Sequence, residues 1–140
     1  MHNVTIISMK RLVITTTVKD EVVDITEKVN NIVQQSGVER VWCGMFVTHT
    51  TCCLTTADLD PGTDKDLLDA LRKISPDLPY RHPHNPSHAS DHILSSLIGP
   101  SLVVLVENGQ IFLGDWQRIV LVELNGPRKR TILLSCINEK

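Results

Sequence analysis

The sequence predicts an α+β fold: a β-sandwich of mainly antiparallel strands, with about three helices packed against it and a C-terminal β-meander. Helix-capping patterns followed by apolar residues at helical spacing occur twice before residue 75, and hairpin-linked strand signals fill residues 101–140. A chain of 140 residues can bury roughly two-thirds of its unfolded surface, so we expect one domain over residues 1–140.

The first part of the chain combines strand and helix signals. Asp24 and Glu27 have the spacing of a capping box at the start of a helix. Apolar residues then recur at helical spacing until Gly37, which is suited to the left-handed conformation that ends a helix. β-branched and apolar runs on either side predict strands. The expected elements are strands at residues 4–8 and 11–18, a helix at 25–36 and a central strand at 38–48, with its extension through 50–55 left open.

The middle of the chain predicts two helices joined by a long loop. A turn sequence ends at Gly62, a second capping pattern starts at Thr63, and Pro76 disfavours helical conformation in the residue before it. The loop of residues 76–87 contains three further prolines, and a loop of this length is more often functional than a simple connection. The third helix is expected to begin at Ser87 or Ser90 and to run through Leu97.

Residues 101–140 contain only strand and turn signals. Asn108–Gly109 is a strong hairpin signal, and Asn125–Gly126 begins a second turn. We therefore predict an antiparallel meander. Its expected strands are residues 101–106, 111–116, 117–124 and 130–137.

Composition argues against several kinds of partner. The net charge is −2, lysine and arginine are scattered, and five residues are aromatic, so we expect no nucleic-acid surface. We also expect no membrane association, because no apolar run approaches the ~20 residues that span a bilayer. The amino terminus lacks a signal-peptide pattern, which favours the cytoplasm. We expect buried, inert thiols at the four cysteines, with a zinc–thiolate site or a redox pair as alternatives.

Histidine is the leading chemical signal. His49 directly follows the apolar central strand, and four more histidines lie between His82 and His92. Neutral imidazoles bind zinc and similar ions, and three protein ligands with one open position are typical of catalytic zinc. The spacing therefore suggests a metal site. A solvated histidine-rich loop is the alternative.

A second candidate group follows the strand at residues 117–124. Arg128 and Arg130 are two residues apart, so extended backbone places both guanidinium groups on one face, near Glu123 across the turn. Two such groups can grip phosphate or carboxylate, although a surface ion pair is equally consistent. Carboxylates that could orient an imidazole or act as a base are Asp58, Asp60, Asp66 and Asp91, with helix capping as the simpler role for Asp66.

Short motifs along the chain resemble the YjbQ-like family, whose members are labelled secondary thiamine-phosphate synthases. They span nearly the whole chain. The motifs are DIT at Asp24–Thr26, HTT at His49–Thr51, DP at Asp60–Pro61, YxH at Tyr80–His82, HILSSLIG at His92–Gly99, GxxxLGxWQ at Gly109–Gln117 and ExxGPRxR at Glu123–Arg130.

The resemblance implies an α+β sandwich that assembles as a homotrimer, with a site near the subunit boundaries. It singles out His49, His82 and His92 as ligands of a divalent metal ion such as zinc, and gives His84 and His88 less weight. It also implies a site role for Gln117, Glu123, Arg128 and Arg130. This chain departs from the family where Ala57–Asp58 replaces the usual Asn-Glu, and where His88 replaces a common asparagine.

The activity named for the family joins a pyrimidine pyrophosphate to a thiazole phosphate and releases pyrophosphate. Two hypotheses stay open. The first is a small enzyme acting on a phosphorylated heterocycle, with a histidine metal site and an arginine anion clamp. The second is a non-catalytic module that binds a metal or a small anion, and a zinc-dependent hydrolase is a further alternative to the first.

Overall fold

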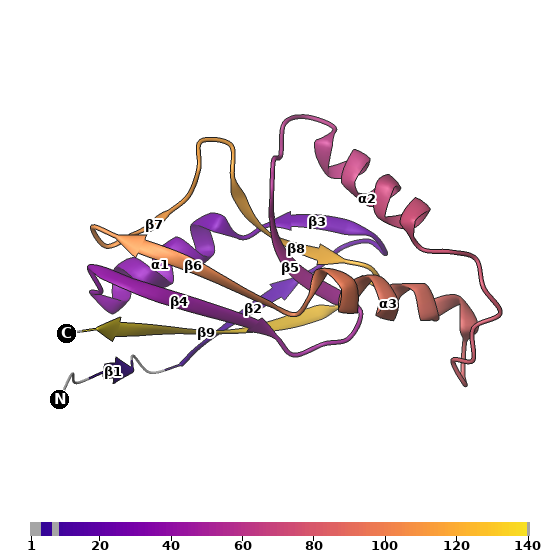
Figure 1. The fold of residues 1–140 in the computed structure, drawn as a ribbon, viewed down its shortest axis with the longest axis horizontal. Helices are drawn as coiled ribbons and strands as arrows, with labels where there is room; N and C mark the ends of the chain where they lie inside the picture. Colours follow the sequence, from indigo (N-terminus) through magenta and orange to yellow (C-terminus); the bar gives the residue numbers. More distant parts are fainter. Residues whose placement is uncertain (1–3, 7–8, 140) are drawn as a thin grey trace.

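The computed structural model describes residues 4–6 and 9–139. Over these residues the chain has an α+β fold with three α-helices and two antiparallel sheets, one of which is curled into a half-barrel (Figure 1). The elements are β1 Val4–Ile6, β2 Lys10–Thr15, β3 Glu21–Asp24, α1 Thr26–Ser36, β4 Arg40–Val47, β5 Cys52–Ala57, α2 Thr63–Ile74, the short 3₁₀ helix η1 Pro86–His88, α3 Ala89–Ile98, β6 Ser101–Glu107, β7 Gln110–Phe112, β8 Arg118–Glu123 and β9 Lys129–Glu139.

Strand order differs from the expected C-terminal meander. In the larger sheet the order is β1-β9-β4-β6-β7, with β2 also paired to β9, and in the smaller sheet it is β3-β8-β5. Only β6 and β7 form the predicted hairpin, because the chain then crosses to the small sheet for β8 and returns for β9. Turn residues reveal where a strand ends, but they do not identify its neighbour in the sheet. Five of the six residues of β8 are buried, as suits a strand at the centre of its sheet.

The first half contains two further differences. Residues 52–57 do not extend β4, since the chain turns at residues 48–51 and β5 joins the other sheet. The short strand β3 was not predicted, because residues 19–23 were given no element from the sequence. Asp24 does accept a hydrogen bond from the Thr26 amide at 3.0 Å, but Glu27 contacts Arg118 instead of completing a capping box.

The ends of the helices confirm one predicted capping signal and not another. Gly37 ends α1 with φ 71°, as its sequence position predicts. The capping pattern at the start of α2 is not used, because Gly62 precedes the helix and no side chain of residues 4–6 or 9–139 caps it. None of the described helices has the length and apolar character needed to cross a membrane.

The apolar core lies in two clusters on either side of the small sheet. The larger cluster contains inward-facing residues of β4, β6, β9 and α1, including Val29, Met45 and Ile132. The smaller cluster joins the other face of β8 to α2 and α3 through residues such as Leu71 and Leu94. This second cluster packs α3 against the small sheet, and the C-terminal end of α3 lies beside the end of β4 and the start of β9 (Figure 1).

Two of the four cysteines form a disulfide. Cys43 on β4 lies directly opposite Cys136 on β9, with their Cα atoms 4.1 Å apart. The expectation of four inert thiols is therefore wrong for this pair, whose separation of 93 residues hid the contact. Cys52 and Cys53 are free and buried, and burial raises the pKa of each thiol to about 12, which leaves both unreactive.

Candidate functional site

An open cleft of about 620 Å³ lies where three segments of the chain meet. These are the turn between β4 and β5, the start of α3, and the turn between β8 and β9. Its floor and walls combine hydroxyl, imidazole and cationic side chains: Thr48, His49, Thr50, Thr51, His88, His92, Asn125, Arg128, Lys129 and Arg130. These residues come from three separate parts of the sequence, so the fold is what gathers them.

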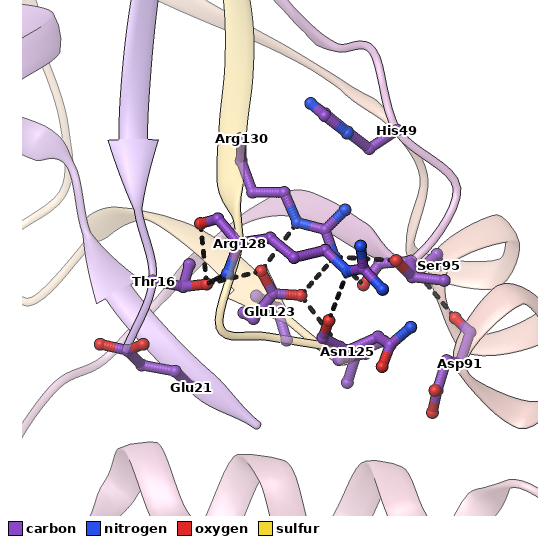
Figure 2. Close-up of polar contacts among 12 residues, drawn as sticks. Thr16, Glu21, His49, Asp91, Ser95, Glu123, Asn125, Arg128 and Arg130 are labelled. Carbon is purple, nitrogen blue, oxygen red and sulfur yellow. Dashed lines mark hydrogen bonds and ion pairs between the residues drawn. The ribbon is translucent and has the colours of Figure 1, made fainter. Parts of the chain in front are cut away.

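A buried ion pair supports this cleft from below. The Arg130 guanidinium donates to both carboxylate oxygens of Glu123, at 2.7 Å and 2.5 Å, and also to Thr51 Oγ1 at 2.8 Å (Figure 2). Both side chains are almost fully buried, at 3% and 0% exposure. Burial alone would raise the pKa of Glu123, but hydrogen bonds from Arg130, the Asn125 amide and Thr16 outweigh it and hold that pKa below its ordinary value.

Arg128 differs from Arg130 in its exposure. Its side chain is exposed, and its Nε donates to the Asn125 carbonyl at 2.9 Å. Its two terminal nitrogens have no hydrogen-bond partner within the described part of the chain, so they are free to meet a ligand. The two arginines therefore have different roles. Arg130 binds the buried Glu123 carboxylate (Figure 2), whereas Arg128 is exposed to solvent.

His49 is half-buried at the edge of the cleft, and its Nε2 accepts a hydrogen bond from the Thr131 amide at 2.9 Å. A neutral imidazole that accepts through Nε2 carries its proton on Nδ1. Burial, together with the positive charge of Arg130, lowers the pKa of His49 and favours this neutral form. His49 is thereby placed to donate a hydrogen bond from Nδ1.

The other histidines are divided between the cleft and the loop beside it. His88 and His92 line the cleft, and His88 Nδ1 lies 3.4 Å from the Asn125 amide nitrogen. His82 stacks on His92 with ring centroids 5.0 Å apart, and its buried Nδ1 has no hydrogen-bond partner among the described residues. His84 is exposed. The structure thus brings His49 and His92 to one cleft, with His82 behind His92.

The three expected metal ligands do not fit a metal ion as they are placed. Among the described residues of one chain, no group of three histidine, cysteine or acidic side chains is arranged to hold one. His49 is also unsuited chemically, because its Nε2 lone pair is occupied by the Thr131 amide and its Nδ1 then carries the proton.

The remaining predicted residues lie elsewhere. Gln117 accepts from the Gly114 amide and donates to Thr56, each at 3.0 Å, which holds the turn between β7 and β8. Asp91 is fully buried and pairs with Arg72 at 2.6 Å instead of with an imidazole. Asp66 is exposed on α2, and Asp58 and Asp60 line a separate depression beside Trp116.

The comparisons with known proteins agree with this fold and these motifs. A family described as "UPF0047 protein YjbQ-like" matches residues 10–139. The chain belongs to this YjbQ-like family. UPF0047 protein YugU of Bacillus subtilis is 37% identical over 127 residues, covering 88% of this chain and 94% of YugU. UPF0047 protein Rv2556c of Mycobacterium tuberculosis is 38% identical over 125 residues, covering 86% of this chain and 92% of that protein.

Solved structures of YjbQ-like proteins match over the same length. A YbjQ-like protein of unknown function from Sulfolobus solfataricus has a TM-score of 0.89 at 29% identity, covering 98% of this chain and 100% of its own. An uncharacterised YjbQ/UPF0047 protein from Clostridium acetobutylicum has a TM-score of 0.82 at 35% identity, covering 89% and 97%. The relatives establish the family and the fold of this YjbQ-like protein, and their names leave the reaction open.

Sequence reasoning missed two residues that contact the site in the structure of this YjbQ-like protein, Asn125 in the lining of the cleft and the buried Thr16. Asn125 was interpreted only as part of a turn, yet its side chain reaches His88 and its carbonyl holds Arg128. Thr16 contacts Glu123 and Arg128 from the end of β2. Asn125 lies inside the ExxGPRxR motif and could have been included. Thr16 has no comparable local signal.

Proposed function

We propose that this YjbQ-like protein is a small cytoplasmic enzyme acting on a phosphorylated heterocycle, whose phosphate binds in the cleft beside His49. The observation that carries the proposal is the collection of hydrogen-bond donors at one open surface. Arg128 and Lys129 supply positive charge to the cleft, and the hydroxyl-bearing residues Thr48 and Thr50 line it as well. Charged donors and hydroxyls of this kind bind phosphate oxygens.

The anion clamp differs from the paired arginines expected from spacing. Arg130 holds Glu123, so we assign the contact with phosphate to Arg128 and Lys129, with Arg130 as the support beneath them. The neutral His49 would then donate from Nδ1 to a phosphate or leaving-group oxygen. Stabilising negative charge on departing pyrophosphate is the main requirement of thiamine-phosphate formation, and fixed donors supply it efficiently.

A neighbouring depression supports the heterocyclic part of the proposal. It has a volume of about 480 Å³ and shares Thr48, His49 and Thr50 with the cationic cleft. Its other walls include Phe46, Cys52 and Pro100, and most of its lining is apolar. A ligand with a flat apolar body and a phosphate tail would occupy both depressions, with His49 between its two parts.

The test is anion binding by an Arg128→Ala variant. We expect pyrophosphate, measured by titration calorimetry at low salt, to bind the variant at least about tenfold more weakly, because a charged hydrogen bond is worth roughly 1.5–3 kcal/mol. Lys28→Ala is the matched control, since it removes the same charge from an exposed position on α1 and should leave binding unchanged. Equal affinities for the two variants would contradict the proposal.

Metal binding remains a separate prediction. The observation that favours it is the buried Nδ1 of His82 beside His92, which has no partner in the part of the chain that the structure describes. A stoichiometric divalent ion in untagged protein, found by elemental analysis, would support the zinc-dependent hydrolase. Tight anion binding without turnover of phosphorylated heterocycles would favour the non-catalytic module.

We also propose that the protein is a homotrimer joined through the outer face of the larger sheet. Large apolar side chains are exposed there on β4 and β6: Trp42, Phe46, Val103 and Leu105. We expect sedimentation to give about three times the chain mass of 15.6 kDa, and Phe46→Glu to give smaller species. Ile74→Glu, which changes an exposed residue on α2, should leave the mass unchanged, and a monomeric wild type would contradict the proposal.

A further inference from the structure

Thr16 lies at a junction that the proposed function does not use. It directly follows β2, whose last ladder pair is Thr15 with Lys129, and its side chain is 2% exposed. Its contacts are with Glu123 and Arg128, more than a hundred residues away in the sequence. We infer that Thr16 is a positioning residue, which fixes the backbone of Arg128 so that the guanidinium faces the cleft.

The hydrogen bonds of Thr16 hold Arg128 at both of its backbone polar groups. The Arg128 amide donates to Thr16 Oγ1 at 2.9 Å, and the Thr16 amide donates to the Arg128 carbonyl at 2.9 Å (Figure 2). Thr16 Oγ1 lies 2.9 Å from Glu123 Oε2 and 3.1 Å from the Arg128 carbonyl oxygen. A hydroxyl has one proton, and the carboxylate is the stronger acceptor. Thr16 therefore bridges the buried Glu123 to the backbone of Arg128.

The side chain of Arg128 is held from the same carboxylate by a second route. Glu123 Oε1 accepts the Asn125 amide at 2.9 Å, and the Asn125 carbonyl accepts from Arg128 Nε at 2.9 Å. One carboxylate oxygen thus fixes the backbone of Arg128 and the other fixes its guanidinium. With both routes intact, the terminal nitrogens of Arg128 are preorganised, and less ordering entropy is lost when an anion binds.

Two substitutions of Thr16 distinguish the effect of its hydroxyl group from the effect of its side-chain volume. Valine has nearly the shape of threonine but its side chain neither donates nor accepts. Thr16→Val therefore leaves the Arg128 amide without its acceptor and removes one of the two hydrogen bonds to Glu123 Oε2, which keeps the bond from Arg130 Nε. Serine keeps the hydroxyl and loses only a methyl group. A residue needed only for packing would tolerate valine better than serine, whereas a positioning residue should show the opposite order.

The experiment compares Thr16→Val, Thr16→Ser and a matched control. Thr26→Val removes another buried hydroxyl, 5% exposed, which accepts from the Ile119 amide at 2.8 Å and donates to Asp24 at 2.7 Å, away from the cleft. For each folded variant, pyrophosphate affinity and the exchange rate of the Arg128 amide hydrogen are measured. We expect Thr16→Val to weaken binding roughly tenfold and to speed that exchange at least about tenfold. Thr16→Ser and Thr26→Val should stay near the wild type in both.

The two readouts distinguish this inference from the proposed function on which it rests. If the wild type does not bind pyrophosphate, the proposed anion site is wrong, and Arg128 exchange alone decides the positioning role. Unchanged exchange in Thr16→Val would overturn the inference whatever the binding result. Wild-type affinity in Thr16→Val, or equal losses in Thr16→Val and Thr26→Val, would also overturn it.

Discussion

Replacing Arg130 with methionine is expected to lower the free energy of unfolding by about 3–5 kcal/mol, the usual cost of breaking a buried ion pair. The loss is large because Glu123 has no exposed surface through which water could replace the guanidinium. Denaturant unfolding at a fixed protein concentration measures it, since subunit contacts would make stability depend on concentration.

The matched control for this prediction is Arg118→Met. Arg118 also pairs with carboxylates, Asp24 at 2.8 Å and Glu27 at 3.4 Å, but these groups are 35%, 36% and 73% exposed. Solvated pairs of this kind contribute roughly 0.2–1 kcal/mol. A similar loss of stability in the two variants would contradict the assignment of Arg130 as the buried support of the cleft.

The dependence of stability on pH gives a second test of the Glu123–Arg130 ion pair. Because hydrogen bonds hold the pKa of Glu123 below its ordinary value, the carboxylate binds its proton more weakly in the folded chain than in the unfolded one. The stability it contributes is present above that ordinary pKa, near 4.5, and is lost as the pH falls through the lower folded value. Glu123→Gln should therefore remove part of the wild-type loss of stability in acid.

The sequence predicts those parts of the site that lie within one continuous motif. The HTT motif places His49 just after β4, and the ExxGPRxR motif places Glu123 next to Arg130 because a tight turn joins their strands. These motifs do not show which of their side chains are buried. Spacing alone made Arg128 and Arg130 equivalent, whereas in the structure Arg130 is buried against Glu123 and Thr51 and Arg128 is exposed just before β9.

Contacts between distant segments explain the other differences. Thr16 contacts Glu123 across a sequence separation of 107 residues, and Cys43 bonds to Cys136 across 93. Local periodicity cannot predict contacts between segments so far apart. A contact of the same kind bears on the expected role of His49 as a metal ligand. The neighbouring strand β9 supplies the Thr131 amide, which donates to His49 Nε2.

Gly126→Ala is expected to disturb both the fold and the cleft. A methyl group built at Gly126 would lie 2.2 Å from the Val18 carbonyl oxygen, 2.8 Å from Thr16 Oγ1 and 2.9 Å from Glu123 Cγ. The nearest of these atoms is backbone, which cannot move aside as a flexible side chain can. Overpacking of this kind costs roughly 1–3 kcal/mol, and we expect a value near the upper limit.

The control for this substitution is Gly114→Ala, because a methyl group there would meet its nearest neighbour at 3.6 Å, an ordinary contact. We expect its unfolding midpoint to stay close to that of the wild type. For Gly126→Ala we expect lower stability and weaker pyrophosphate binding together, since the turn must shift away from residues 16–18 and take Asn125 and Arg128 with it. Wild-type binding in a destabilised Gly126→Ala protein would show that Arg128 does not depend on this turn, and would remove the physical link between the buried carboxylate and the anion site.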